Sequence, residues 1–375
     1  MEPKQHNFLE TTFRGINQKR KFEELSKRNI GITLYHDEPT MNALGILDSV
    51  MYLFNQLGWE KALIKTRFAT YRELTFEFLS SLVHLPEHGK GTRKGFISFR
   101  LFGINFVYNH KDLADLLGFP SGPFAFSTTQ VELMDIELDY FWGTLTGNYH
   151  PDPDNMDNDE IHNPAIRYFH KMLAHTVFGK EENQTAVSKD EIFLLYCMHQ
   201  GHPINAVPFL MQTFYRIIDN PDEPIIIGGL VTMIAHALGL RHQLNRCPHF
   251  GTIRPMNLAF CFNRRMIANH AYPPYDYLIR DEVVNLFTLP NHNKVSVHNR
   301  DNWLYELNPP DQPPTSETPQ DYQIYDDIMS DMGDPETPPG YYENVNMAEA
   351  HAAPETTTKD YTDNQIGRAS CRERV

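Results

Sequence analysis

Apolar side chains recur three or four positions apart along most of the first 300 residues, which places them on one face of a helix. The range 41–57 has this spacing and is followed by Gly58, a residue suited to closing a helix. The range 71–82 repeats the pattern. Further apolar helices are expected at 209–218, 230–240 and 283–289. The pattern therefore predicts a mainly helical body.

Polar residues at the starts of several segments, and glycines at their ends, have the chemistry of helix caps. A side-chain oxygen at the first position accepts from the backbone N–H groups that the first turn leaves unpaired. Glycine adopts the left-handed conformation that often ends a helix. The candidate caps are Asn109 with Gly118, Asn163 followed by Pro164 and ending at Gly179, and the capping-box pair Ser188 and Glu191.

Two short segments have the composition of strands instead. The range 96–108 alternates, is rich in aromatic and β-branched residues, and has Gly103 at a plausible turn, which predicts a hairpin. The range 225–227 is apolar and precedes two glycines, which predicts a short buried strand. The expected fold class is mainly α, an α-rich α+β body with a minor β-hairpin and a disordered acidic C-terminal tail.

The net charge of −15 is concentrated near the C-terminus. The range 301–365 contains fifteen acidic residues and only one basic residue, Lys359, together with nine prolines. Such a segment buries too little apolar surface to offset its ordering entropy, so we expect it to be disordered. The predicted organisation is a polar basic arm at 1–35, a helical domain at 36–300 and this acidic tail. The first 300 residues are then nearly neutral.

The final ten residues, 366–375, read IGRASCRERV. Their back-translation, ATCGGAAGAGCGTCGTGTAGGGAAAGAGTG, looks like a common short-read sequencing adapter. We therefore treat this segment as an artefact and leave it out of the reasoning about the fold.

The chain has no apolar run close to the roughly 20 residues that cross a bilayer, and its first residues lack the apolar core of a signal peptide. The four cysteines show no paired spacing typical of a secreted disulfide framework. We expect an intracellular protein without a membrane partner, in the nucleus or the cytoplasm.

Candidate metal and catalytic residues do not have the spacing that their chemistry needs. The strings Cys197-Met-His199-Gln-Gly-His202 and Cys247-Pro-His249, with Cys261, supply ligand types but not the paired spacing of structural zinc sites. The acidic loop 152–160 fails the order of a calcium loop. Asp326 and Asp327 lie in the Pro-rich tail, where no core hairpin would hold two metal ions. We predict no catalytic residues, no bound metal and no cofactor.

Basic residues form two groups that suit contact with nucleic acid. The range 224–275 contains no acidic residue, and aromatic side chains are interleaved with its arginines, a composition that can contact phosphates and stack on bases. The alternative is that these arginines pair with carboxylates elsewhere in the fold. The candidate contacts are Arg14, Lys19, Arg20, Lys21, Lys27 and Arg28 in the arm, and Arg241, Arg246, Arg254, Arg264 and Arg265 in the second group.

Several strings in the range 35–290 resemble the first-open-reading-frame protein of Athila-type plant retrotransposons, of the gypsy class. They are YRELTFEFLSSL, ISFRLFGINFVY with DLLGFP, IRYFHKMLAHTVFGKEEN, SKDEIFLLYCMHQGHPIN and IIIGGLVTMIAHALGL, in the family order. These are patterns of core and cap residues, so the resemblance implies a lineage and a structural role but no catalytic residue.

The leading hypothesis is a non-enzymatic, gag-like retroelement protein that self-assembles or packages RNA, and so binds other copies of itself and single-stranded nucleic acid weakly. The acidic tail is expected to compete for the same basic groups. The alternative is a host nuclear protein-interaction module that binds basic proteins through this tail. A metal-dependent enzyme is the distant alternative.

Overall fold

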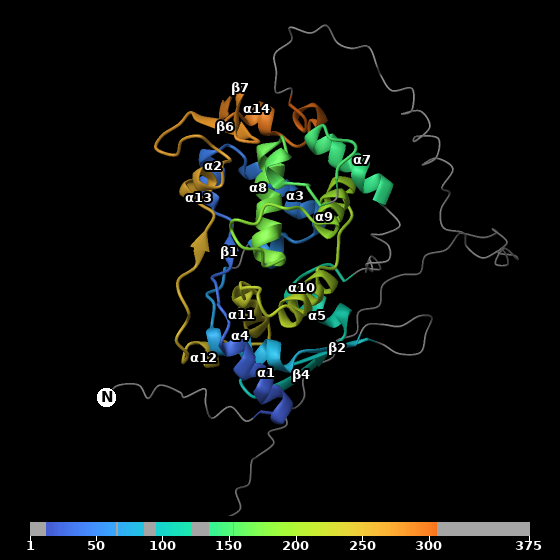
Figure 1. Ribbon diagram of the computed structural model, residues 1–375, viewed down its shortest axis with the longest axis vertical. Helices are drawn as coiled ribbons and strands as arrows, with labels where there is room; N and C mark the ends of the chain where they lie inside the picture. Colours follow the sequence, from blue (N-terminus) through green and yellow to red (C-terminus); the bar gives the residue numbers. More distant parts are fainter. Residues whose placement is uncertain (1–12, 65–66, 86–94, 122–134, 153, 306–375) are drawn as a thin grey trace, which may run out of the picture. The chain divides into compact units, whose positions relative to one another are not determined.

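The computed structural model describes residues 13–64, 67–85, 95–121, 135–152 and 154–305 (Figure 1). About half of these residues lie in helices, and the strands form three small sheets, so the mainly helical fold class is confirmed. The proposed tail from residue 306 onward, the segment 366–375 and the first twelve residues of the arm lie outside the described residues. No helix among the described residues is both long and apolar enough to cross a membrane.

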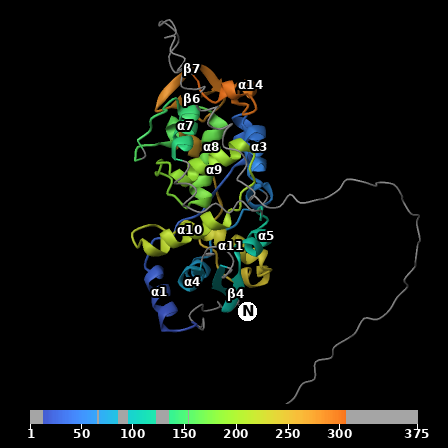
Figure 2. The same cartoon turned by 90° about the vertical axis from the view of Figure 1, so that its right-hand side faces the viewer.

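One group of helices packs around α3 (Leu47–Leu57), which contacts both α8 (Pro164–Met172) and α9 (Lys189–Gln200) (Figures 1 and 2). The helix α7 (Asp135–Thr146) packs against α9. The contact between α3 and α8 includes an edge-to-face aromatic pair, since the ring centroids of Phe54 and Phe169 lie 4.7 Å apart.

A second group packs around α4 (Arg72–Ser81), which contacts α1 (Ile16–Ser26), α10 (Val207–Asp219), α11 (Gly228–Ala237) and the strand β3 (Phe96–Leu101). Phe78 of α4 is fully buried, and its ring lies 5.1 Å from the rings of both Phe99 and Phe214. The helix α5 (His110–Leu117) packs against α10 and α11.

Shorter elements connect these groups. The strands β1 (Leu34–Tyr35) and β5 (Arg254–Pro255) pair in parallel although they are far apart in the sequence. The remaining elements are the α-helices α2 (Glu38–Ala43), α12 (Arg241–Leu244), α13 (Leu258–Asn263) and α14 (His292–Val295), the π-helical turns η2 (Glu60–Ile64) and η4 (Leu173–Val177), and the 3₁₀ turns η3 (Asn158–Glu160) and η5 (Arg300–Asn302).

The predicted caps are confirmed. The side-chain oxygen of Asn109 accepts from the backbone N–H of Asp112, and Gly118 ends α5 in the left-handed conformation. Asn163 caps α8 with Pro164 at its first position, and Gly58 ends α3. Ser188 and Glu191 form both bonds of the capping box of α9. The local chemistry of the sequence therefore fixes where these helices begin and end.

The predicted hairpin is confirmed, and the structure adds a third strand to it. The strands β3 and β4 (Ile104–Tyr108) pair antiparallel around Phe102 and Gly103, both with positive φ. The strand β2 (Val83–Leu85) pairs with the other edge of β3. Phe99 and Leu101 face the core, while Ser98 and Arg100 lie on the opposite side of the sheet, beside α1.

The helix predicted at 283–289 is wrong, because this range lies in the strand β7 (Glu282–Leu289). It pairs antiparallel with β6 (Tyr275–Ile279). Arg280 and Asp281 form the turn between them, both with positive φ. The range is short and rich in β-branched and aromatic residues, and the partner strand decides between the two conformations.

Two further predicted elements differ in detail. The single helix expected over 41–57 is two helices, α2 and α3, separated by Gly45 in the left-handed conformation. In the range 225–227 only Ile225 pairs, through a parallel bridge to Ile30, so no regular strand forms there. The apolar periodicity detected burial in both cases but not the local path of the backbone.

The described body extends past residue 300, where the helical domain was expected to end. Trp303 and Tyr305 are buried, the indole of Trp303 donates to the carbonyl of Val297, and the backbone N–H of Tyr305 donates to His162. Any shortened chain that preserves the core should therefore end no earlier than Tyr305.

Candidate nucleic-acid interface

Three of the predicted arginines lie in ion pairs. Glu182 pairs with both Arg254 and Arg264, the latter at 3.1 Å, and Arg265 pairs with Asp281 at 2.7 Å. The two pairs of Glu182 join the region after α12 to the segment before α9, whereas Arg265 and Asp281 both follow α12. The alternative interpretation of this arginine-rich range, pairing with carboxylates elsewhere in the fold, therefore describes these three side chains.

Arg28 also serves the fold. Its guanidinium donates to the carbonyl oxygens of Ile217, Asn220 and Glu223, at 2.7, 2.8 and 2.5 Å. Ile217 and Asn220 lie at the C-terminal end of α10, so Arg28 satisfies carbonyl groups that the helix itself leaves unpaired, and Glu223 follows in the next turn. This position gives Arg28 a structural role that its place in a basic sequence did not indicate.

Lys19 and Arg20 form exposed pairs with Glu23 and Glu24 one turn along α1, both at 3.9 Å. Exposed pairs of this kind contribute about 0–1 kcal/mol, so their cations remain accessible to a competing anion. The remaining arm residue of this helix end, Lys27, is exposed and has no ion pair among the described residues.

The start of α4 contacts both the segment before Lys27 and the segment that contains Phe250, which follows Arg241 and Arg246 in the second basic group. Arg72 donates to the carbonyl of Ser26 at 3.1 Å, and the backbone N–H of Phe250 donates to the carbonyl of Thr70 at 2.6 Å. The side chains of Arg241, Arg246 and His249 are exposed here, and Phe250 is 37 % exposed. We call Lys27, Arg72, Arg241, Arg246 and Phe250 the basic surface.

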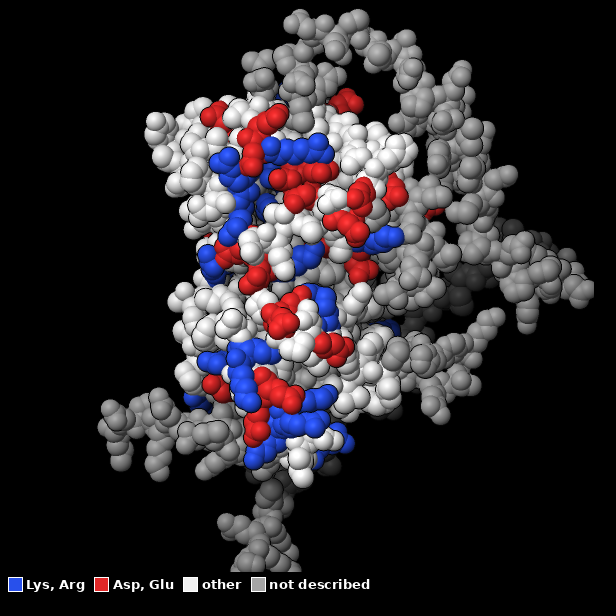
Figure 3. Space-filling model, in the orientation of Figure 1, with Lys and Arg blue, Asp and Glu red and all other residues white. Residues whose placement is uncertain are grey.

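Acidic side chains interrupt this region. Figure 3 shows Lys and Arg interleaved with Asp and Glu over the lower part of the visible face, where Figure 1 places α1. The alternation limits the local positive potential, so contacts with phosphates here are expected to be weak and sensitive to salt. Sequence analysis missed Arg72, because nothing in the sequence indicates that α4 begins between the two basic groups.

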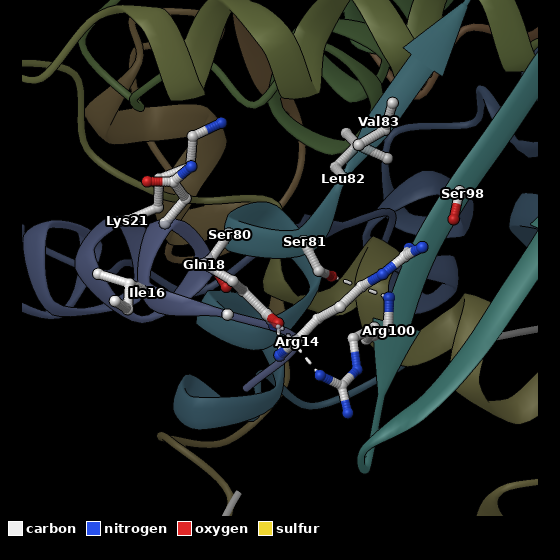
Figure 4. Close-up of a pocket in the computed structure, with 12 residues that line it drawn as sticks. Arg14, Ile16, Gln18, Lys21, Ser80, Ser81, Leu82, Val83, Ser98 and Arg100 are labelled. Atoms are coloured by element: carbon white, nitrogen blue, oxygen red, sulfur yellow. Dashed lines mark hydrogen bonds between the residues drawn. The ribbon is translucent and has the colours of Figure 1, made fainter. Parts of the chain in front are cut away.

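Arg14 and Lys21 lie instead on a cavity of about 840 Å³ between α1, the end of α4 and the strands β2 and β3 (Figure 4). Arg100 and Gln18 also line it and were not predicted as site residues. The alternation of the range 96–108 does place Arg100 on the outer side of the hairpin. Only the packing of α1 against that side creates the cavity.

The cysteine and histidine side chains considered as metal ligands include two buried thiols and a histidine ring that packs against aromatic rings. Cys197 and Cys261 are buried, and burial raises the pKa of each thiol to about 12. The His199 ring stacks on Phe141 and lies 4.9 Å from Trp303. Among the described residues, no three His, Cys, Asp or Glu side chains are grouped so that they would hold a metal ion.

A buried polar cluster joins α8 to α9. Glu191 is fully buried, forms an ion pair with Lys180 and lies 3.5 Å from Nε2 of His170. Nearby, burial lowers the pKa of Lys171 to about 7, and burial together with Asp157 raises the pKa of Asp159 to about 6. Shifted pKa values also occur in structural ion-pair networks. None of these residues lines the cavity beside α1, so we assign the cluster to the fold.

Hydrogen bonds within the acidic loop 152–160 and to the segment before α9 hold this loop. The Asp157 side chain accepts from the N–H of Asp159 and from the hydroxyl of Thr185. Asp326 and Asp327 lie outside the described residues.

The model of the ATHILA ORF-1 family matches residues 21–198, somewhat less than half of the chain. This range includes α3, α4, α8, the hairpin β3–β4 and the capping box, together with the second half of α1 and most of α9. No curated protein and no solved structure matches the chain. The strings that lie inside this range agree with the match, so residues 21–198 are similar to the ATHILA ORF-1 family, the first-open-reading-frame proteins of Athila-type retrotransposons.

Proposed function

We propose that this chain is a non-enzymatic structural protein of its retroelement that binds single-stranded RNA weakly and without sequence preference. The observation that carries the proposal is the basic surface, in which the exposed ring of Phe250 lies beside the start of α4 and the cations of Lys27, Arg241 and Arg246 are exposed. Cations that contact phosphates and a ring that stacks on bases are the components of such recognition. The similarity of residues 21–198 to the ATHILA ORF-1 family supports a structural role but supplies no catalytic residue.

The electrostatics predict the kind of binding. Few unpaired cations and interleaved carboxylates leave the body without a strong positive field, so affinity depends on a small number of phosphate contacts. When the logarithm of affinity is plotted against the logarithm of salt concentration, each phosphate contact with a single strand adds about −0.7 to the slope. Binding is therefore measurable only at low salt.

The double substitution Lys27→Ala with Arg246→Ala tests the basic surface. We expect the affinity for a short oligouridylate to fall about tenfold at about 50 mM salt, with a salt slope flatter by about 1.4. The measurement is fluorescence anisotropy over a series of salt concentrations. The matched control is Lys294→Ala with Arg300→Ala, which removes two exposed charges from the end of the body that carries α14. Equal effects of the two double variants would show that only net charge matters, and would remove the support for the basic surface.

Removal of the acidic segment should strengthen binding. A chain ended after Tyr305 keeps Trp303 and Tyr305 in the core and loses the negative charge that repels RNA. We expect several-fold higher affinity at about 50 mM salt, with the difference shrinking as salt is added. Anisotropy on both chains measures this, and circular dichroism shows whether both are folded. Lower affinity of the shortened chain would mean that the segment itself binds RNA.

Packaging requires assembly in addition to binding. Size-exclusion chromatography with and without RNA should show large assemblies only when RNA is present. If both chains fail to bind RNA at about 50 mM salt, the packaging proposal loses its physical basis. The interaction of the acidic segment with basic proteins then becomes the better explanation.

A further inference from the structure

The cavity beside α1 opens at the N-terminal end of this helix, where Gly15, Ile16 and Asn17 line it (Figure 4). The first N–H groups of a helix have no partner within the helix and carry partial positive charge. In α1 no side chain caps them, and the first turn contains no acidic residue. This end of the helix therefore suits an anion.

Gln18 gives an independent indication of a ligand. Its side-chain oxygen accepts from the backbone N–H of Arg14 at 2.8 Å and from the Arg100 guanidinium at 3.1 Å, so the orientation of the amide is fixed. Its Nε2 is then left as a buried donor without an acceptor among the described residues, although Gln18 is only 8 % exposed. A buried donor without a partner costs about 1–3 kcal/mol, which an anionic acceptor in the cavity would recover.

The charged side chains that line the cavity, Arg14, Lys21 and Arg100, also favour an anion. Figure 4 shows Arg14 extending past Ser81 toward the strand that carries Ser98, while Arg100 lies below it and Lys21 one turn further along α1. The Nε of Arg100 also has no acceptor among the described residues. None of the described residues that line the cavity is acidic. The hydroxyls of Ser80 and Ser81 donate to backbone carbonyls of α4. The donors for a tetrahedral oxyanion are therefore the cations, the helix N–H groups and the hydroxyl of Ser98.

The size and the walls of the cavity indicate more than a free phosphate. Its volume of about 840 Å³ falls in the range of about 300–1,000 Å³ typical of small-molecule sites. Ile16, Leu82 and Val83 add apolar walls that suit the sugar and base of a nucleotide. Carboxylates of an acidic peptide would use the same cations, but the uncapped helix end together with these apolar walls favours a phosphate that carries a nucleoside.

We propose that this cavity binds a phosphate group of single-stranded nucleic acid together with its attached nucleoside, which makes it a second contact beside the basic surface. The inference rests on the proposed function for its source of phosphate. The local chemistry, however, is independent of the basic surface, because none of Lys27, Arg241, Arg246 and Phe250 lines the cavity.

The test uses the full chain and three substitutions. Arg14→Ala removes an exposed cation, and Gln18→Glu keeps the acceptor for Arg14 and Arg100 while replacing the donor with a negative charge. Lys294→Ala on α14 is the control of equal charge to Arg14→Ala. Inorganic phosphate and uridine monophosphate are titrated by calorimetry, and uridine monophosphate then competes with labelled oligouridylate in anisotropy. Circular dichroism confirms that each variant is folded.

We expect Gln18→Glu and Arg14→Ala each to weaken binding of uridine monophosphate about tenfold and to weaken RNA binding in parallel. The affinity of Lys294→Ala for uridine monophosphate should stay within about twofold of that of the original chain. Uridine monophosphate bound equally well by both variants and by the original chain would overturn the proposal. A poly-glutamate peptide that competes better than the nucleotide would also overturn it, and would assign the cavity to carboxylates.

Two outcomes separate this inference from the proposed function. If RNA binding responds to Lys27→Ala with Arg246→Ala but not to Gln18→Glu, the cavity is excluded while the basic surface stands. If uridine monophosphate binds at the cavity but oligouridylate binds nowhere, the phosphate chemistry is supported, but both the nucleic-acid source and the proposed function are overturned.

Discussion

Replacement of Glu191 by Ala should lower the free energy of unfolding by about 3–5 kcal/mol, because it removes one member of a buried ion pair. The Glu191 carboxylate is fully buried and accepts from the backbone N–H of Ser188 at 2.7 Å while pairing with Lys180. The alanine variant leaves Lys180 without its partner and breaks the capping box of α9. Urea unfolding followed by circular dichroism measures the change.

Glu191→Gln is the matched variant, since it keeps an acceptor for Ser188 and loses only the charge. We expect it to cost clearly less than Glu191→Ala. Equal costs for the two variants would assign the effect to charge alone, and a cost near zero for both would show that the cluster contributes nothing to stability.

Glu191 also makes the free energy of unfolding depend on pH. Burial by itself raises the pKa of Glu191, but His170 and Lys180 outweigh it and lower the pKa from 4.5 to about 2. Burial lowers the pKa of His170, so this ring is neutral at pH 7 and Lys180 is the cationic partner there. A carboxyl group with a lowered pKa stabilises the fold above its unfolded pKa, and this contribution is lost as pH falls from about 4.5 toward 2. The difference in unfolding free energy between the original chain and Glu191→Gln should therefore shrink through this window.

Replacement of Trp59 by Ala should lower the free energy of unfolding by about 3–5 kcal/mol, because it leaves a cavity in the core. Trp59 is fully buried, its indole N–H donates to the carbonyl of Ile204 at 2.7 Å, and its ring lies 5.6 Å from that of Phe119. The side chain thus joins the end of α3 to the chain segments before α10 and after α5. A shift of the urea midpoint at constant slope would identify the change as one of stability.

Trp59→Phe keeps an aromatic ring beside Phe119 and loses the hydrogen bond to Ile204, so it should cost about 1 kcal/mol for that bond, plus a smaller cavity term. If Trp59→Ala costs no more than Trp59→Phe, the site collapses around the smaller side chain and the packing assigned to the indole is wrong.

The sequence by itself determined those features that depend on neighbouring residues. Asn109, Asn163 and the pair Ser188 and Glu191 cap helices where predicted, because a cap bond joins groups two or three residues apart. The turn at Gly103 likewise follows from its own backbone preference. Apolar periodicity also placed most of the core helices, since burial on one face leaves the same spacing wherever the partner lies.

The tertiary structure alone decided features that depend on distant partners. The range 283–289 is a strand because β6 supplies its hydrogen bonds, and the helical domain continues beyond residue 300 because Trp303 and Tyr305 enter the core. Arg28 and the arginines paired with Glu182 bind groups far away in the sequence. Composition does not reveal such partners, and it therefore placed these arginines among the candidate nucleic-acid contacts. The cavity beside α1 depends in the same way on the packing of Gln18 against Arg100, which are 82 positions apart. Local chemistry thus set the elements, whereas contacts between remote segments decided which charged side chains remain available to a ligand.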